Sequence, residues 1–239
     1  MQYSKLKDTL VLGSSRGLGK SLYKLFESDG SKVIGVSRSQ SKQSDFICDL
    51  SNKDDVKNLI KTFYDSGSVA KNIIFNAGQG SSRKKTVKER KEELMQHNFH
   101  TSKNFVEELK KTPEVLELIE TFTFINSICA LENFNCSEEY SESKFELLKY
   151  SRGLSKDFLK YGIRVNSILP GNIMHQNSVW HKKFENEMEE KIFLKNTMPS
   201  GDWIYPEDVF GSIKYLIQNK NVVGTEIILD GGQNLFSPD

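Results

Sequence analysis

The sequence has little of what marks secreted, metal-binding or membrane-spanning proteins. Its 239 residues include three cysteines without CxxC spacing and four histidines that do not accompany them at metal-ligand spacing. We therefore expect free thiols in a reducing, cytoplasmic compartment and no bound metal. No apolar run approaches the ~18 residues that cross a bilayer, and the amino terminus has no apolar stretch of signal-peptide length. A membrane-spanning or secreted protein is disfavoured.

The chain also lacks an excess of charge of either sign. Lys and Arg total 33 against 32 acidic residues, which gives a net charge of +1. Such a balance offers no general electrostatic surface for nucleic acid or an anionic membrane. The densest basic run, residues 83–91, contains Glu89 and continues into two more glutamates. We interpret this run as a solvated loop and helix start.

Short apolar runs rich in β-branched residues alternate with longer amphipathic stretches. Strands apolar on both faces and separated by helices predict a parallel sheet covered on both sides. We therefore expect an α/β, doubly wound parallel sheet of about seven strands, with residues 1–239 forming a single domain. The expected strands are 9–13, 32–37, 45–48, 72–76, 121–126, 163–169 and 226–230, and the expected helices are 17–28, 53–64, 87–111, 138–160 and one from 206.

One long connection, residues 171–200, interrupts this alternation. It is polar and aromatic, and it follows a strand. Long connections at the carboxyl ends of parallel strands often carry substrate contacts. We predict a substrate lid at about 172–200, with a surface insertion that has no role as the alternative.

A tyrosine and a lysine stand four residues apart, Tyr140 and Lys144, in the run YSESK. On a helix this spacing places both side chains on one face. A nearby cation favours the phenolate and lowers the pKa of a tyrosine from its usual value of about 10. The pair could therefore shuttle a proton, although many surface helices carry the same spacing.

A glycine-rich loop, GSSRGLG, follows the first expected strand and opens a helix. Glycines allow a tight turn and close approach to phosphate, and a helix amino terminus supplies free N–H groups. The loop has one residue too many for a P-loop and does not match the GxGxxG fingerprint. The predicted phosphate-binding residues are Gly13, Ser14, Ser15, Arg16, Gly17, Leu18 and Gly19.

Taken in order, these features resemble the simple, single-domain members of the short-chain dehydrogenase/reductase family. The resemblance runs from the first strand to Gly232, and Ser127 precedes Tyr140 by thirteen residues, as is typical of that family. Its elements are GSSRGLG, Asp49, Asn76-Ala77-Gly78, Asn98, Ser127, Tyr140-x-x-x-Lys144, Pro170-Gly171, Pro206-Glu207-Asp208 and Leu229-Asp230-Gly231-Gly232.

The resemblance implies a catalytic role for four residues. Tyr140 would protonate a carbonyl oxygen, or act as the base in reverse, while Ser127 hydrogen-bonds the same oxygen. Lys144 would hold the ribose hydroxyls of the coenzyme and lower the pKa of Tyr140. Asn98 would order a water that links Lys144 to solvent.

The end of the second expected strand indicates which coenzyme is bound. NAD-preferring relatives commonly carry an acidic residue there, which binds the ribose hydroxyls. This chain has Ser37 followed by Arg38, and Arg16 lies in the glycine loop. Guanidinium groups suit a 2′-phosphate, so we predict NADP(H). The resemblance assigns the adenine contact to Asp49 and Leu50, the coenzyme floor to Asn76, Ala77 and Gly78, and the nicotinamide contact to Pro170, Gly171 and Ile173.

Two positions depart from the family pattern. Leu12 stands where a threonine usually precedes the loop, and His175 stands where a threonine often lies near the nicotinamide. The first loses a hydrogen bond without removing a catalytic group. We leave His175 out of the catalytic set.

The leading hypothesis is an NADPH-dependent reductase of a carbonyl, or a dehydrogenase of an alcohol, acting on a small polar or amphipathic substrate such as a sugar-pathway compound. One alternative is a 3-oxoacyl-thioester reductase that acts on acyl carrier protein. Another, of a different class, is a non-catalytic NADP-binding regulator. The resemblance also implies a homodimer or homotetramer formed through helices 87–111 and 138–160 and the last strand.

Overall fold

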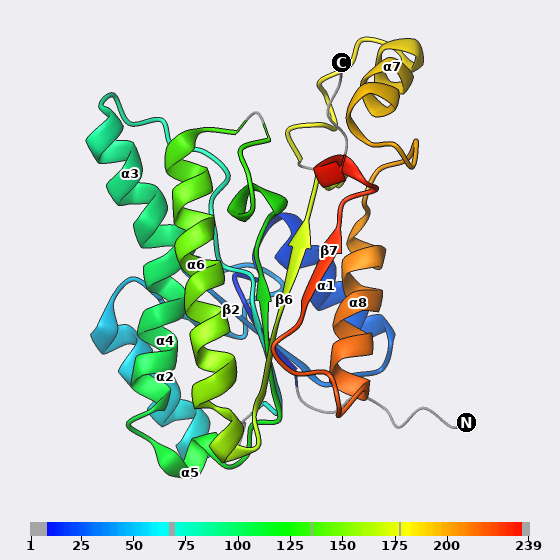
Figure 1. The fold of residues 1–239 in the computed structure, drawn as a ribbon. Helices are drawn as coiled ribbons and strands as arrows, with labels where there is room; N and C mark the ends of the chain where they lie inside the picture. Colours follow the sequence, from blue (N-terminus) through cyan, green and yellow to red (C-terminus); the bar gives the residue numbers. More distant parts are fainter. Residues whose placement is uncertain (1–8, 67–69, 135, 177, 236–239) are drawn as a thin grey trace.

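The computed structural model describes residues 9–66, 70–134, 136–176 and 178–235. Predictions for the first eight residues, and for residue 177 of the predicted lid, fall outside this part. The described chain forms one parallel sheet in the order β3-β2-β1-β4-β5-β6-β7 (Figure 1). The strands are β1 (Thr9–Leu12), β2 (Val33–Ser37), β3 (Phe46–Ile47), β4 (Asn72–Phe75), β5 (Thr121–Ile125), β6 (Arg164–Pro170) and β7 (Glu226–Leu229).

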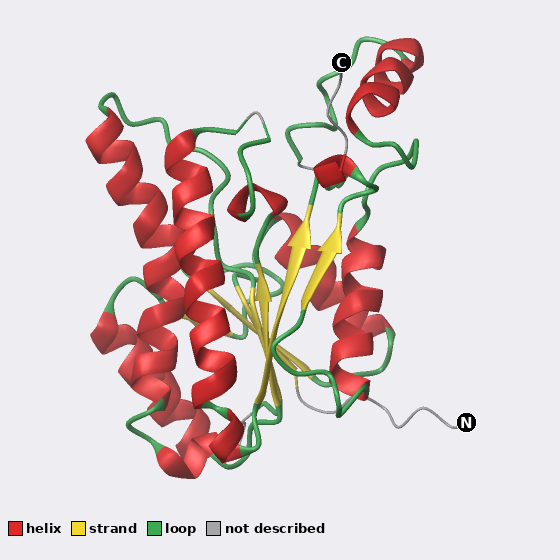
Figure 2. Cartoon of the chain, viewed as in Figure 1, coloured by secondary structure: helices red, strands yellow, loops and turns green. Residues whose placement is uncertain are grey.

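Helices cover both faces of this sheet. One layer holds α1 and α8, and the other holds α2, α3, α4 and α6, as the helices on either side of the strands show (Figures 1 and 2). The helices are α1 (Gly17–Ser28), α2 (Lys53–Ser66), α3 (Val87–Met95), α4 (Thr101–Leu109), α5 (Pro113–Leu116), α6 (Glu138–Asp157), α7 (Glu187–Thr197) and α8 (Pro206–Gln218). The predicted doubly wound parallel sheet is confirmed.

Apolar strands explain why the sheet lies between two layers. Every residue of β1, β4, β5 and β6 is buried, so neither sheet face can be left to water. On the α6 side the core is aromatic: Phe75 stacks on Phe124 with ring centroids 4.2 Å apart, and Phe105 and Phe122 meet Phe75 edge-on. This packing fixes the strands whose carboxyl ends form the site.

The predicted helix 87–111 differs in one respect. It is helical throughout 87–109, but α3 and α4 are joined by a π-helical turn, Gln96–His100. A π turn inserts an extra residue and is frequent at functional sites. The predicted irregular region 171–200 also contains a regular element, α7, whose amino terminus is capped by Asn186. No helix among the described residues is long and apolar enough to cross a membrane.

Candidate active site

A cleft of about 550 Å³ runs along the carboxyl ends of the strands. This is the edge of a doubly wound sheet where ligands bind. An inner chamber of about 270 Å³ shares several wall residues with the cleft, so the two are continuous. The shared wall consists of Leu18, Asn76, Gly78, Gln79, Gly80 and His175.

The glycine loop forms the floor of the cleft beneath the start of α1. Gly13 has φ of +90°, and a Cβ there would lie 2.7 Å from the Cα of Ala77. A larger residue would therefore both strain the backbone and push the glycine loop away from Ala77, in the loop after β4. Gly17 also has a positive φ, and the ring of His175 lies over it. The loop thus holds its backbone close to the cavity, as a phosphate-binding turn requires.

Two of the predicted loop contacts do not reach the cleft. Ser14 is fully buried, and its hydroxyl donates to the carbonyl oxygen of Gln43 at 2.5 Å. Gly19 is also buried, packed against the carbonyl of Gly13 and the side chain of Asn76. Both residues brace the loop from behind. Neither residue lines the cleft, because their side of the loop faces the protein interior, and their predicted contact with the coenzyme stays a prediction.

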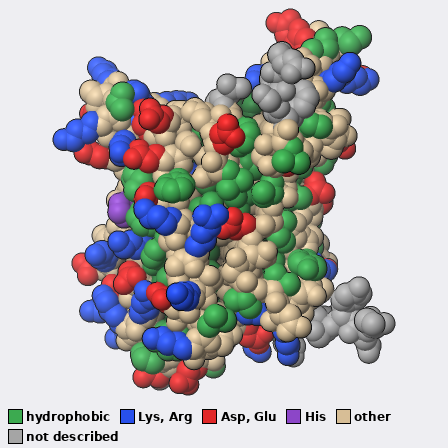
Figure 3. All heavy atoms as spheres, viewed as in Figure 1, with side chains coloured by type: hydrophobic (Ala, Val, Ile, Leu, Met, Phe, Trp, Pro, Cys, Tyr) green, Lys and Arg blue, Asp and Glu red, His purple; other side chains and the backbone are tan. Residues whose placement is uncertain are grey.

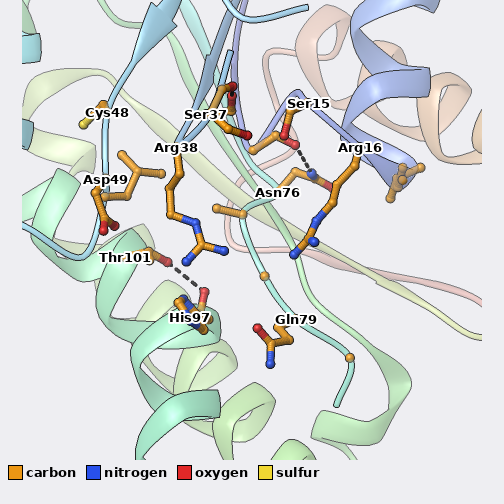
Figure 4. A pocket seen from close by; sticks show the side chains of 18 of the residues that line it. Ser15, Arg16, Ser37, Arg38, Cys48, Asp49, Asn76, Gln79, His97 and Thr101 are labelled. Atoms are coloured by element: carbon orange, nitrogen blue, oxygen red, sulfur yellow. Dashed lines mark hydrogen bonds between the residues drawn. The ribbon is translucent and has the colours of Figure 1, made fainter. Parts of the chain in front are cut away.

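Positive charge gathers at the outer end of the cleft. Arg16 is the N-cap residue of α1, and Arg38 follows β2; both are exposed and reach into the same cavity (Figure 4). The hydroxyl of Ser37 is instead used internally, since it hydrogen-bonds the carbonyl of Ser39 and the hydroxyl of Ser44, each at 2.7 Å. Asp49 lines the same end of the cavity, near Arg38 (Figure 4). Two cations and one anion therefore line this end of the cavity.

Asp49 is held in place by its own loop. Its carboxylate accepts hydrogen bonds from the backbone N–H of Ser51 at 3.0 Å and from the hydroxyl of Ser51 at 2.7 Å. Burial opposes ionisation, but these hydrogen bonds and the charge of Arg38 outweigh it, so the pKa of Asp49 is lowered. The carboxylate is a fixed negative charge beside Arg38.

The inner chamber brings together three of the four predicted catalytic residues, Ser127, Tyr140 and Lys144. Ser127 lies two residues after the end of β5, and its hydroxyl accepts from the backbone N–H of Cys129. Tyr140 lies in the first turn of α6, where Ser137 caps the helix, and Lys144 follows one turn later. The start of α6 and the end of β5 lie together at the carboxyl edge of the sheet, so the three side chains reach the same chamber.

Burial dominates the electrostatics of this chamber. It raises the pKa of Tyr140, while a hydrogen bond with Ser127 acts in the opposite direction. Burial also lowers the pKa of Lys144 to about 8. The Nζ atom of Lys144 lies 5.9 Å from the Tyr140 ring centroid and donates to the carbonyl of Ile125 at 3.3 Å. The raised pKa of Tyr140 runs against the predicted lowering by Lys144: burial is the largest influence on it, and Lys144 is not among the groups that shift it.

Asn98 lies beside the chamber, in the π turn. Its side chain is fully buried: the amide donates to the carbonyl of Gln79 and to the hydroxyl of Ser143, and its oxygen accepts from the N–H of Gln79. It therefore ties the loop after β4 to α6. A Cβ on Gly78 would lie 3.0 Å from the oxygen of Asn98 and 3.8 Å from Nζ of Lys144. The absence of a side chain at Gly78 keeps this corner open.

Sequence reasoning missed several residues that line the cavity. His97, Thr101 and Gln79 line the cleft. No spacing pattern identifies them, and the direction of His97 depends on the π turn. His175, which the resemblance places near the nicotinamide, lines both cleft and chamber. Asn126 was also missed: it is 4% exposed, lines the chamber, and its amide nitrogen has no hydrogen-bond partner among the described residues. An unpaired buried donor favours a ligand with an acceptor.

The remaining predicted contacts all reach the cavity. Their places divide between the two parts of the site. The cleft wall contains Ser15, Asp49, Leu50, Asn76, Ala77 and Gly78, and the chamber wall contains Pro170, Gly171 and Ile173.

The predicted lid stands beyond the carboxyl ends of β6 and β7, with α7 outermost (Figure 1). Ile173 and His175 contribute to the chamber wall, and Ile173 bridges to Ile204. The aromatic residues of this region pack on one another instead: Phe193 lies 5.1 Å from Trp180 and 5.6 Å from Trp203 between ring centroids. These rings hold the segment to the body of the protein, so they carry no argument about substrate polarity.

Comparisons with known proteins agree with this geometry. The family model described as enoyl-(acyl carrier protein) reductase, a short-chain dehydrogenase/reductase model, matches residues 13–234. A bovine (Bos taurus) 3-oxoacyl-[acyl-carrier-protein] reductase is 26% identical, over 94% of this chain and 97% of its own length.

Solved structures share the fold at lower identity. The ligand-free aldohexose dehydrogenase of Thermoplasma acidophilum has a TM-score of 0.85 at 21% identity and covers 99% of this chain and 98% of its own. A 4-hydroxyisoleucine dehydrogenase complexed with NADH has a TM-score of 0.81 at 22% identity and covers 97% of this chain and 100% of its own. An NADPH-bound short-chain oxidoreductase of Pseudomonas aeruginosa with an atypical catalytic centre has a TM-score of 0.82 at 20% identity and covers 96% of this chain and 98% of its own. With the family model matching nearly its whole length, the chain belongs to the short-chain dehydrogenase/reductase family of oxidoreductases.

Proposed function

We propose that this protein is an NADP(H)-dependent oxidoreductase that interconverts a carbonyl and a hydroxyl group on a small polar or amphipathic substrate. One observation carries the proposal: Ser127, Tyr140 and Lys144 line a chamber that opens into a cleft with Arg16 and Arg38 at its far end. The cavity therefore has a proton-transfer end and a phosphate-binding end.

The residues present fit a nicotinamide coenzyme. Gly13, Ser15 and Gly17 line the cleft beside the start of α1, where the free N–H groups of a helix amino terminus would hold phosphate. When bound, the coenzyme supplies or accepts a hydride at carbon. Ser127 and Tyr140 hold the carbonyl oxygen by hydrogen bonds, and Tyr140 gives it a proton as negative charge develops. Lys144 returns a proton to Tyr140.

The proposed preference for NADP(H) over NAD(H) rests on the positive charge at the outer end of the cleft. Solved structures of this fold hold either NADH or NADPH. In this chain no carboxylate stands at the end of β2, where Ser37 is followed by Arg38, and Arg16 reaches the same cavity. A guanidinium pair would bind a 2′-phosphate through charge-assisted hydrogen bonds.

The catalytic assignment is tested with Tyr140→Phe. Loss of the proton donor should lower turnover about 10²- to 10⁴-fold and leave the NADPH dissociation constant unchanged. The assay follows NADPH oxidation with keto sugars, ketoacyl thioesters and simple ketones. Tyr150→Phe is the matched control, because this tyrosine is on the same helix but hydrogen-bonds Glu107 in a groove on the outer face. Equal turnover of wild type and Tyr140→Phe would refute the mechanism, and NADPH binding without turnover of any substrate would favour a non-catalytic regulator.

A 3-oxoacyl-thioester reductase is the second candidate, favoured by the name of the bovine relative. Arg83, Lys84 and Lys85 are exposed and closely follow Ser81 on the cleft wall, where an acidic carrier protein could dock. Elsewhere on the face in Figure 3, basic and acidic side chains are intermingled. Acetoacetyl-thioester with NADPH is the direct test. Absence of turnover would exclude this candidate, and turnover insensitive to Lys84→Glu would exclude docking at the basic run.

We further propose that the chain forms a homodimer or homotetramer. Exposed apolar side chains support this on two elements: Phe145 on α6 is 47% exposed and Ile228 on β7 is 44% exposed. Light scattering of the purified protein tests it, and a monomer at micromolar concentration would refute it.

The lid role of residues 172–200 likewise stays a prediction. Shortening the segment between β6 and α7 would test it through the KM for the substrate.

A further inference from the structure

His97 stands out because it is directed into the coenzyme cleft without any role in the reaction proposed above. It lies in the π turn between α3 and α4, next to Asn98, and it lines the cleft together with Arg16 and Arg38. Figure 4 shows the guanidinium of Arg38 directed toward the His97 ring and that of Arg16 entering the same space. Three basic side chains from three separate elements thus face one end of the cavity.

Four charged residues influence the protonation of His97: Arg16 before α1, Arg38 after β2, Asp49 after β3 and Glu93 on α3. Arg38 and Arg16 disfavour its protonation, and Asp49 and Glu93 favour it. Burial is the largest influence and, with Arg38, lowers the pKa of His97. The lowered pKa favours the neutral imidazole. A dianion placed among the three groups would reverse the balance, because it would draw a proton onto the ring.

We propose that His97 is a specificity-determining residue for the coenzyme: it takes up a proton when a 2′-phosphate binds and becomes the third cation that holds it. The inference rests on the proposed function. A ribose that carries only hydroxyls brings no such charge, so it would leave His97 neutral. The preference for NADPH over NADH is then greater at lower pH, down to about pH 6, where a phosphate monoester itself becomes protonated.

The experiment measures dissociation constants of NADPH and NADH by fluorescence titration between pH 6.5 and 8.5. For one proton taken up, the NADPH constant should fall by up to about tenfold per pH unit as pH decreases, while the NADH constant stays level. His97→Gln should remove this slope and weaken NADPH most at pH 6.5. His100→Gln is the matched control, because His100 lies in the same π turn but outside the cleft wall; it should behave as wild type.

Adenosine 2′,5′-bisphosphate and 5′-AMP repeat the comparison without the nicotinamide half. The bisphosphate should show the same slope and 5′-AMP none. If His97→Gln weakens both coenzymes equally at every pH, the ring contacts adenine and the proposal is overturned. A wild-type NADPH constant without pH dependence overturns it while leaving the proposed function intact. Binding of NADH alone overturns both.

Discussion

Lys144→Met is expected to stabilise the protein while abolishing turnover. Lys144 is 7% exposed, and its ammonium makes a hydrogen bond of 3.3 Å with the carbonyl of Ile125. Burial is the largest influence on the pKa of Lys144, and no carboxylate in the described part of the chain contributes to it. A buried ammonium without a counter-ion costs free energy. Methionine has a similar length and no charge, so it removes that cost.

The pKa of Lys144 sets the magnitude. Burial lowers it from 10.5 to about 8, and at 1.36 kcal/mol per unit this corresponds to about 3 kcal/mol of lost stability below pH 8. Between pH 8 and 10.5 the unfolded chain holds a proton that the folded protein does not. The free energy of unfolding of the wild type therefore rises with pH across this window. Methionine binds no proton, so the advantage of the variant is greatest at pH 7 and shrinks toward pH 10.

Urea denaturation of the coenzyme-free protein at pH 7 and pH 10 tests this reasoning. The stability difference between Lys144→Met and wild type should be about 2–3 kcal/mol larger at pH 7 than at pH 10. Loss of the hydrogen bond to Ile125 lowers the stability of the variant equally at pH 7 and pH 10. The change in the stability difference between the two pH values therefore reports only the cost of the buried charge. Lys149→Met is the control, because Lys149 is exposed on the same helix and pairs with Glu146 at 2.6 Å. An equal difference at the two pH values would refute the argument.

Three further predictions concern the coenzyme cleft and the core. Arg38→Ala should weaken NADPH by about 1.5–3 kcal/mol, the loss of a charged hydrogen bond, with NADH unchanged in parallel titrations; an equal loss for both coenzymes would contradict the assignment. Gly13→Ala should destabilise the protein and abolish coenzyme binding, because its Cβ would lie 2.7 Å from Ala77 Cα. A variant whose melting temperature in calorimetry and whose coenzyme affinity equal those of the wild type would contradict this. Phe75→Ala should cost about 3–5 kcal/mol in urea denaturation, because Phe75 is 1% exposed and stacked on Phe124; a smaller loss would mean that the core collapses into the space.

The features that sequence reasoning predicted are those set by local patterns. Strand apolarity fixed the sheet and its edge, so side chains that directly follow strands, such as Ser127, Asp49 and Asn76, had to meet there. The spacing of Tyr140 and Lys144 predicted that their side chains share one helix face, and it did so correctly because α6 is a regular helix from its Ser137 cap onward. In each case one element and its end determine the position.

The features that it missed depend on contacts between elements. The π turn at Gln96–His100 cannot be read from periodicity, yet it places His97 on the cleft wall and Asn98 against Gln79. Ser14 has the right place in the loop, but its hydroxyl reaches the carbonyl of Gln43, twenty-nine residues away. Which side of a loop faces a cavity is decided by such distant partners.

The pKa values of Tyr140 and Lys144 require the structure for the same reason, and they give the proposed proton transfer a direction. Spacing alone suggests that the cation lowers the pKa of the phenol, but burial raises it and lowers the pKa of Lys144 to about 8. Lys144 is then the stronger acid of the two. After Tyr140 has protonated a carbonyl oxygen, proton transfer from Lys144 to the phenolate is downhill. In the opposite direction Tyr140 must first lose its proton against the same gradient. Below pH 8 Lys144 is charged and, in the proposed reduction, would return a proton to Tyr140.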